Sequence, residues 1–71
     1  MDSVSDIAFF ALVVRQGTLS AAAQELDVTP PAVSRRLAAL ENRLGIRLLN
    51  RTTRRISLTY EGELYLEEGR R

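Results

Sequence analysis

Apolar residues recur at helical spacing in the central part of the chain. Between residues 30 and 44, four of them fall on one narrow stripe when successive residues are placed about 100° apart around a helix axis. These residues are Val33, Leu37, Leu40 and Leu44. The pattern predicts a helix whose leucine stripe packs against the core.

Both ends of this helix are also indicated by the sequence. Thr29 can accept a backbone N–H bond as the N-cap, and Pro30 and Pro31 occupy first-turn positions whose N–H groups have no helical partner. Gly45 supplies the left-handed residue that ends a helix. We therefore expect one helix over residues 30–44.

The face of this helix opposite the leucine stripe is small and flat. It carries Pro31, Arg35, Ala38, Ala39 and Asn42, with Ser34 and Arg36 on its flanks. A helix of this kind can lie close against another surface and reach it with guanidinium groups.

Two shorter helices are expected before it. The first begins at a cap supplied by Ser3 or Ser5, ends at Gly17 and serves as a supporting helix. Its core stripe is expected at Ile7, Phe10, Ala11 and Val14.

The second helix is short and almost without side-chain bulk. Thr18 is its expected N-cap, and an alanine run leads to Leu26. Residues 26–29 then form a tight turn with an apolar residue inside it. Two helices joined by such a turn make a helix-turn-helix pattern.

After Gly45 the pattern changes to short β-prone runs. Residues 46–49 and 56–58 flank a polar, arginine-bearing tip at residues 50–55, which predicts a two-stranded β wing. Thr59 then caps a last helix. Its apolar residues lie on more than one face, so we expect it to pack on its own domain and also on a partner. The predicted fold class is mainly α: a winged helix-turn-helix of three helices, a two-stranded wing and a C-terminal helix.

The net charge of +1 conceals a strong segregation. All ten basic residues are arginine, and residues 34–58 hold seven of them against a single glutamate, a net charge of +6. Residues 1–33 carry a net −3 and residues 59–69 a net −4. The centre of the chain is therefore a basic block suited to an anionic partner.

The composition argues against several functions. The chain has no histidine and no cysteine, so the usual neutral-pH base and the commonest metal ligands are missing. The acidic residues show no convergent pair, so we expect no catalytic site, no metal site and no cofactor. No apolar run approaches the ~20 residues of a membrane span, and the N-terminus has no signal pattern.

These residues together resemble the N-terminal DNA-binding domain of LysR-type transcriptional regulators over essentially the whole chain. The resemblance implies sequence-specific duplex DNA binding by a winged helix-turn-helix domain at residues 1–58, followed at residues 59–71 by the start of a linker helix that forms a homodimer. It also implies a bacterial, cytoplasmic regulator that is associated with the nucleoid while bound to DNA. A small-molecule effector would act only through a domain absent from this chain. The matching motifs are Thr18-Leu-Ser-Ala-Ala-Ala-Gln-Glu-Leu, Val28-Thr-Pro-Pro-Ala-Val-Ser-Arg, Leu40-Glu, Leu44-Gly-Ile-Arg-Leu-Leu-Asn-Arg and Leu58-Thr-Tyr-Glu-Gly.

The resemblance also implies which residues read bases. Pro31, Ser34 and Arg35 match the start of the family's recognition helix, residues 30–44. Pro30 departs from the pattern, in which glutamine is common; a proline has no side-chain donor but can touch a thymine methyl. Arg35 sits one turn into the helix, where arginine can form a bidentate bond to guanine. The alternative interpretation is that Arg35 forms an ion pair with Glu41 or Glu25 within the domain.

A second group is expected on phosphates or in the minor groove. For Arg36, a phosphate contact and a salt bridge are equally good interpretations, and Arg51 has the alternative of an acidic partner within the domain. Thr29 and Ser34 can cap or bond the backbone, and a hydroxyl at a helix N-terminus can also hold a phosphate. The group comprises Thr18, Ser20, Thr29, Arg36, Arg51, Arg54 and Arg55, the last three in the wing and Arg54 matching the family's wing arginine.

The last helix supplies the expected dimer interface. We interpret its apolar residues as packing residues rather than base-stacking ones, which favours duplex over single-stranded DNA. They are Tyr60, Leu64, Tyr65 and Leu66. The alternative function is a winged-helix module for protein–protein interaction, whose basic face would meet an acidic partner.

Overall fold

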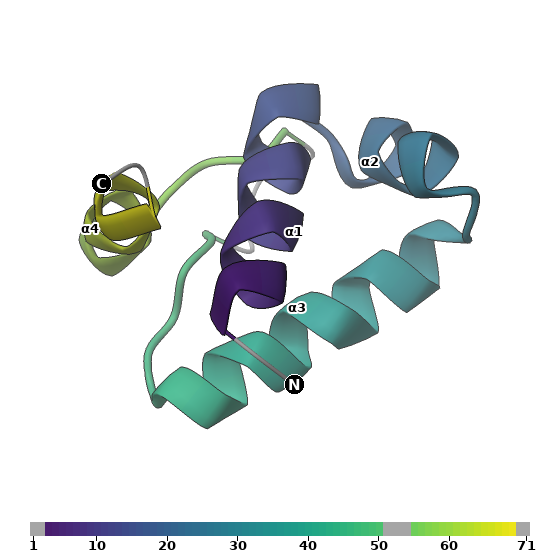
Figure 1. Ribbon diagram of the computed structural model, residues 1–71. Coiled ribbons are helices and arrows are strands. Elements are labelled where there is room, and N and C mark those ends of the chain that lie inside the picture. Colours follow the sequence, from purple (N-terminus) through teal and green to yellow (C-terminus); the bar gives the residue numbers. More distant parts are fainter. Residues whose placement is uncertain (1–2, 51–54, 70–71) are drawn as a thin grey trace.

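The computed structural model describes residues 3–50 and 55–69. Its helices are α1 (Ser3–Gln16), α2 (Leu19–Leu26), α3 (Pro30–Leu44) and α4 (Tyr60–Gly69). Figure 1 shows α1 standing at the centre, with α2 on one side, α4 on the other and α3 crossing beneath. The winged helix-turn-helix class predicted from the sequence is confirmed.

Local chemistry sets the helix ends as the sequence predicts. The Thr18 hydroxyl accepts the N–H of Ala21 at 3.1 Å, and the Thr29 hydroxyl accepts that of Ala32 at 3.3 Å. Gly17 and Gly45 end α1 and α3 with φ angles of 84° and 72°, a region that glycine enters without a steric cost. The caps therefore fix where the helix-turn-helix begins and ends.

The turn between α2 and α3 is closed by backbone hydrogen bonds. Asp27 adopts a left-handed conformation with φ of 58°, and the N–H of Val28 donates to the Ala23 carbonyl at 2.9 Å. The apolar residue inside the turn, Val28, stays 47% exposed. The turn is thus held by its backbone and not by a buried side chain.

The core lies between α1, α2, α3 and the segment after α3. The expected stripe on α3 is confirmed at Val33, Leu37 and Leu40, each at most 1% exposed. The expectation for Leu44 was wrong, since it is 41% exposed. Leu44 is the last residue of α3, and the chain leaves the core at Gly45 before returning with the buried Leu48 and Leu49.

The expected core stripe of α1 is confirmed at Phe10 but otherwise displaced. Phe10 and Val13 are fully buried, and Asp6 and Phe9 are nearly so. Ile7, Ala11 and Val14 are only half-buried, and they line a hollow together with Leu66 and Gly69 of α4. The displacement arises because α1 is covered on two sides, by α2 and by α4, so its inner side is wider than a single stripe.

Two antiparallel bridges form at the base of the wing. One joins Leu49 to Leu58 across the wing, and the other joins Thr18 to Arg55 and so ties the wing to the start of α2. The N–H of Ile56 also donates to the Gly17 carbonyl at 2.8 Å. These are isolated bridges, and no continuous strand forms within the described residues. Of the expected wing tip at residues 50–55, residues 51–54 lie outside them.

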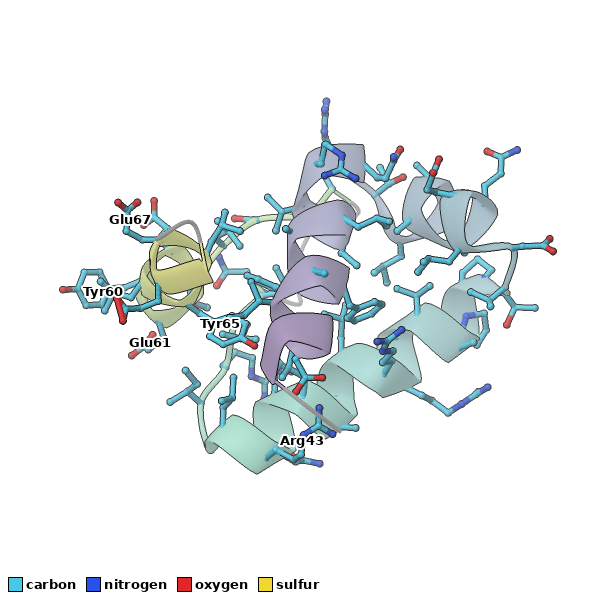
Figure 2. The ribbon with its side chains drawn as sticks, in the orientation of Figure 1. Arg43, Tyr60, Glu61, Tyr65 and Glu67 are labelled. Carbon is cyan, nitrogen blue, oxygen red and sulfur yellow. The ribbon has the colours of Figure 1, made fainter. Side chains whose placement is uncertain are left out.

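The last helix begins at the predicted cap, where the Thr59 hydroxyl accepts the N–H of Gly62 at 3.0 Å. Tyr65 turns toward α1, where its ring meets that of Phe10 edge-on at a centroid distance of 5.5 Å. Figure 2 shows Tyr60 extending the opposite way, and it is 71% exposed. No described helix is long and apolar enough to cross a membrane.

Candidate nucleic-acid interface

The outer face of α3 is an exposed helix surface that carries an arginine. Val33, Leu37 and Leu40 of its inner stripe are buried, so rotation of the helix would expose them to water. Pro31, Arg35 and Ala39 are exposed on the outer side, Ser34 is half-buried beside them, and Pro30 is exposed at the start of the helix. The structure therefore holds a flat face with an arginine near the start of a capped helix.

Arg35 and Glu41 lie on different sides of α3. Arg35 is exposed, whereas Glu41 is only 7% exposed. One oxygen of the Glu41 carboxylate accepts the N–H groups of Leu48 at 2.7 Å and Leu49 at 3.2 Å. Glu41 thus faces the core, and the alternative pairing of Arg35 with Glu41 is not what the structure shows.

Arg36 makes a contact that sequence reasoning missed. Its guanidinium carbon lies 4.1 Å from the centroid of the Phe9 ring on α1, a distance at which a cation is attracted by the face of an aromatic ring. The two residues are far apart along the chain, so no local pattern signals the pair. The contact orients the Arg36 side chain along the flank of α3.

The predicted phosphate-binding residues gather partly around the start of α2. Thr18 caps that helix and Ser20 is exposed in its first turn. The backbone bridge between Thr18 and Arg55 brings the wing to the same place, and Arg55 is exposed there. Thr29 caps α3. Arg51 and Arg54 belong to the residues that the structure does not describe.

One arginine of the basic block has a structural role. Arg43, in the last turn of α3, donates to the nearly buried Asp6 of α1 at 2.8 Å. Burial, and then the charge of Asp6, raise the pKa of the neighbouring Tyr65 above its ordinary value, while Arg43 acts to lower it. The sequence placed Asp6 only at a helix N-terminus and did not predict this pair, because 37 residues separate the partners.

Comparison with known proteins gives a consistent result. The profile of a family described as "Bacterial regulatory helix-turn-helix protein, lysR family" matches residues 4–63. The chain is similar to the HTH-type transcriptional regulator DmlR of Escherichia coli (strain K12), with 46% identity over 68 residues, which cover 96% of this chain and 22% of that protein. The chain spans about a fifth of the length of the curated relatives that it matches.

Two solved structures show the same fold at substantial sequence identity. The CbnR DBD–DNA complex superposes with a TM-score of 0.84 and 38% identity, covering 99% of this chain and 79% of that one. The BenM DBD complex with catB site 1 DNA superposes with a TM-score of 0.86 and 32% identity, covering 97% and 73%. The helices, the turn and the wing base thus share their arrangement with these two chains.

Proposed function

Since the chain belongs to the LysR family of bacterial regulatory helix-turn-helix proteins, we propose that this DNA-binding domain reads duplex DNA with α3 in the major groove. The observation that carries the proposal is the outer face of α3, which pairs an exposed arginine with small residues on a helix locked by its buried stripe. An α-helix fits the width of the major groove.

Base reading centres on Arg35. A guanidinium projecting from the second turn of a groove-bound helix can bond both O6 and N7 of guanine. Pro30, Pro31 and Ser34 lie near the N-terminus of α3, where recognition helices contact bases. The prolines offer apolar contact to a thymine methyl, so Arg35 supplies most of the hydrogen-bonding readout.

Backbone contacts come from the helix N-termini and the wing. Thr18 and Ser20 of α2, and Thr29 of α3, present hydroxyls where helix dipoles favour a phosphate. The bridge between Thr18 and Arg55 supports a shared phosphate-binding surface between α2 and the wing. The arginines of this surface are Arg36, Arg51, Arg54 and Arg55, with Arg54 in or beside the minor groove.

Two copies pair through α4, so that each reads one half-site. Tyr60 and Leu64 are 71% and 49% exposed on the side of α4 away from α1, while Tyr65 and Leu66 stay half-buried and anchor the helix. In this arrangement residues 1–58 form the DNA-reading unit and residues 59–71 begin the linker helix. A small-molecule effector acts through a separate domain, and the regulator works in the bacterial cytoplasm, on the nucleoid while DNA-bound.

Arg35→Ala tests the base-reading role. Binding-site selection from random duplex DNA gives the preferred site, on which affinities are compared with single-base variants and unrelated duplexes. Loss of a bidentate contact should cost about 1–3 kcal/mol at the preferred site and relax the preference at one base pair. Arg15→Ala, an exposed arginine on α1, is the matched control and should bind as wild type. An equal loss on every sequence would make Arg35 a phosphate contact instead.

The alternative of a protein–protein interaction module has no comparable support. Similar solved structures include complexes with DNA, and the relatives are transcriptional regulators. A salt titration separates the two functions. The logarithm of the duplex association constant should fall linearly with the logarithm of the salt concentration, with a slope of about −0.9 per phosphate neutralised. Binding to acidic proteins but not to duplex DNA would favour the alternative.

A further inference from the structure

Leu48 connects the recognition helix to the linker helix. Its N–H donates to the Glu41 carboxylate of α3 at 2.7 Å. Its carbonyl oxygen accepts the N–H of Thr59 at 3.0 Å and the Thr59 hydroxyl at 3.2 Å. The side chain of Leu48 is completely buried. The N–H of Leu48 is therefore bonded to α3, and its carbonyl is bonded to the residue that caps α4.

Both ends of this connection are unusually restrained. Glu41 is nearly buried and also accepts the N–H of Leu49, so its carboxylate fixes two consecutive peptide groups. At the other end, the Thr59 hydroxyl also donates to the Arg47 carbonyl at 2.6 Å. Gly62 lies so close to Leu48 that a Cβ there would overlap the Leu48 carbonyl oxygen. In Figure 1 the segment after α3 runs up between α3 and α4.

The direction of α4 relative to α3 matters when two domains pair through α4. Recognition helices of a dimer read half-sites about 34 Å apart on one face of the duplex. Over that separation, a change of about 5° in the angle between α3 and α4 displaces the recognition helix of the second copy by about 3 Å. This is close to one base-pair step. A small change at Leu48 would therefore alter which half-site spacing fits.

We propose that Glu41 and Thr59 are positioning residues for half-site spacing, because they hold Leu48 from opposite sides and so set the angle between α3 and α4. This inference rests on the proposed pairing through α4. Glu41 is on the inner side of α3 and touches no DNA in this arrangement. Its effect on recognition is transmitted through the Leu48 peptide.

The test measures spacing preference separately from single-site affinity. Duplexes carry two selected half-sites whose separation varies in single base-pair steps, and a further duplex carries one half-site. Glu41→Gln keeps the side-chain shape but removes the charge. Thr59→Val removes the hydroxyl that bonds the carbonyls of Arg47 and Leu48 and that also caps α4 by accepting the Gly62 N–H. Val13→Ala, in the buried part of α1, is a destabilised control that leaves the Leu48 contacts intact. Circular dichroism establishes the folded fraction of each variant.

We expect wild type and Val13→Ala to prefer the same separation. Glu41→Gln and Thr59→Val should shift that optimum, or reduce discrimination against neighbouring separations by about three-fold or more, with one-half-site affinity nearly unchanged. An unchanged optimum in both folded variants would overturn the inference, as would a loss seen equally on one and two half-sites. If Glu41→Gln is unfolded, Thr59→Val alone decides. A wild-type protein without any spacing preference would refute pairing through α4 itself, which distinguishes the two failures.

Discussion

Replacing Gly62 of α4 by alanine sets two effects of opposite sign against each other. In a helix interior, alanine is favoured over glycine by about 0.5–1 kcal/mol because it has less conformational entropy to lose. The added methyl, however, would overlap the Leu48 carbonyl oxygen and lie 3.1 Å from its carbon and 3.3 Å from a methyl of Leu58. Two of these three atoms are backbone, which cannot move aside as the end of a side chain can.

The packing cost should exceed the propensity gain. Overpacking costs about 1–3 kcal/mol. Any movement of α4 away from Leu48 also weakens the hydrogen bond from the Thr59 N–H to that carbonyl, worth about 0.5–1.5 kcal/mol. We expect a net loss of about 2 kcal/mol, from a total of roughly 4–10 kcal/mol for a domain of this size. The midpoint of thermal unfolding should fall by roughly 8–16 °C.

Urea and thermal denaturation followed by circular dichroism measure this change. Glu63→Ala and Glu63→Gly, compared with each other at an exposed neighbouring position of α4, give the propensity difference alone. Subtracting that difference from the effect of Gly62→Ala isolates the contact with Leu48. A Gly62→Ala protein as stable as wild type, or more stable, would refute the close approach of α4 to Leu48.

Three further outcomes are expected. Arg54→Ala should weaken duplex binding and reduce the magnitude of the salt slope by about 0.9; an unchanged slope would contradict a wing–phosphate contact. Because burial and Asp6 raise the pKa of Tyr65 above 10.0, the folded state holds the phenol proton more tightly than the unfolded state. The free energy of unfolding should therefore keep its full value below about pH 10 and fall as the pH rises through the folded pKa; chemical denaturation across this range should show a smaller fall in Tyr65→Phe. Tyr60→Ala with Leu64→Ala should shift analytical ultracentrifugation toward monomer without lowering the melting temperature, since both side chains are exposed; a dimer of unchanged affinity would place the interface elsewhere.

The features that were predicted from the sequence are those decided within one turn of a helix. Thr18, Thr29 and Thr59 cap the helices they precede, and Gly17 and Gly45 end α1 and α3. A cap depends on a hydroxyl and an N–H three residues apart, so a single sequence contains the whole interaction. The fold class follows because these short-range signals delimit a helix-turn-helix.

The features that were missed depend on partners outside the helix that carries the residue. Leu44 continues the periodicity of α3, but periodicity does not show where the covering elements stop. Glu41 looks like a surface residue until the segment after α3 folds back and supplies two N–H groups. Likewise, Gly62 in a helix is unfavourable on local grounds and becomes intelligible only beside the Leu48 carbonyl.

The same dependence limits what the sequence predicts of the site. The position of Arg35 on the outer face of α3 could be predicted from the apolar stripe on the opposite side, and Arg35 is exposed in the structure. The orientation of Arg36 could not be predicted, because its contact Phe9 belongs to another helix. The wing arginines can be identified from the sequence alone. Which residues lie next to them in space depends on how the wing base packs against α2.

The bridge between Thr18 and Arg55 has a consequence for local unfolding. Thr18 caps α2 with its side chain and pairs with the wing through its backbone, while the adjacent Gly17 carbonyl accepts the N–H of Ile56. Opening the wing base would therefore also loosen the start of the helix-turn-helix, although Thr18 and Arg55 are far apart along the chain. We therefore expect native-state hydrogen exchange to show the wing base and the first turn of α2 opening as one cooperative unit.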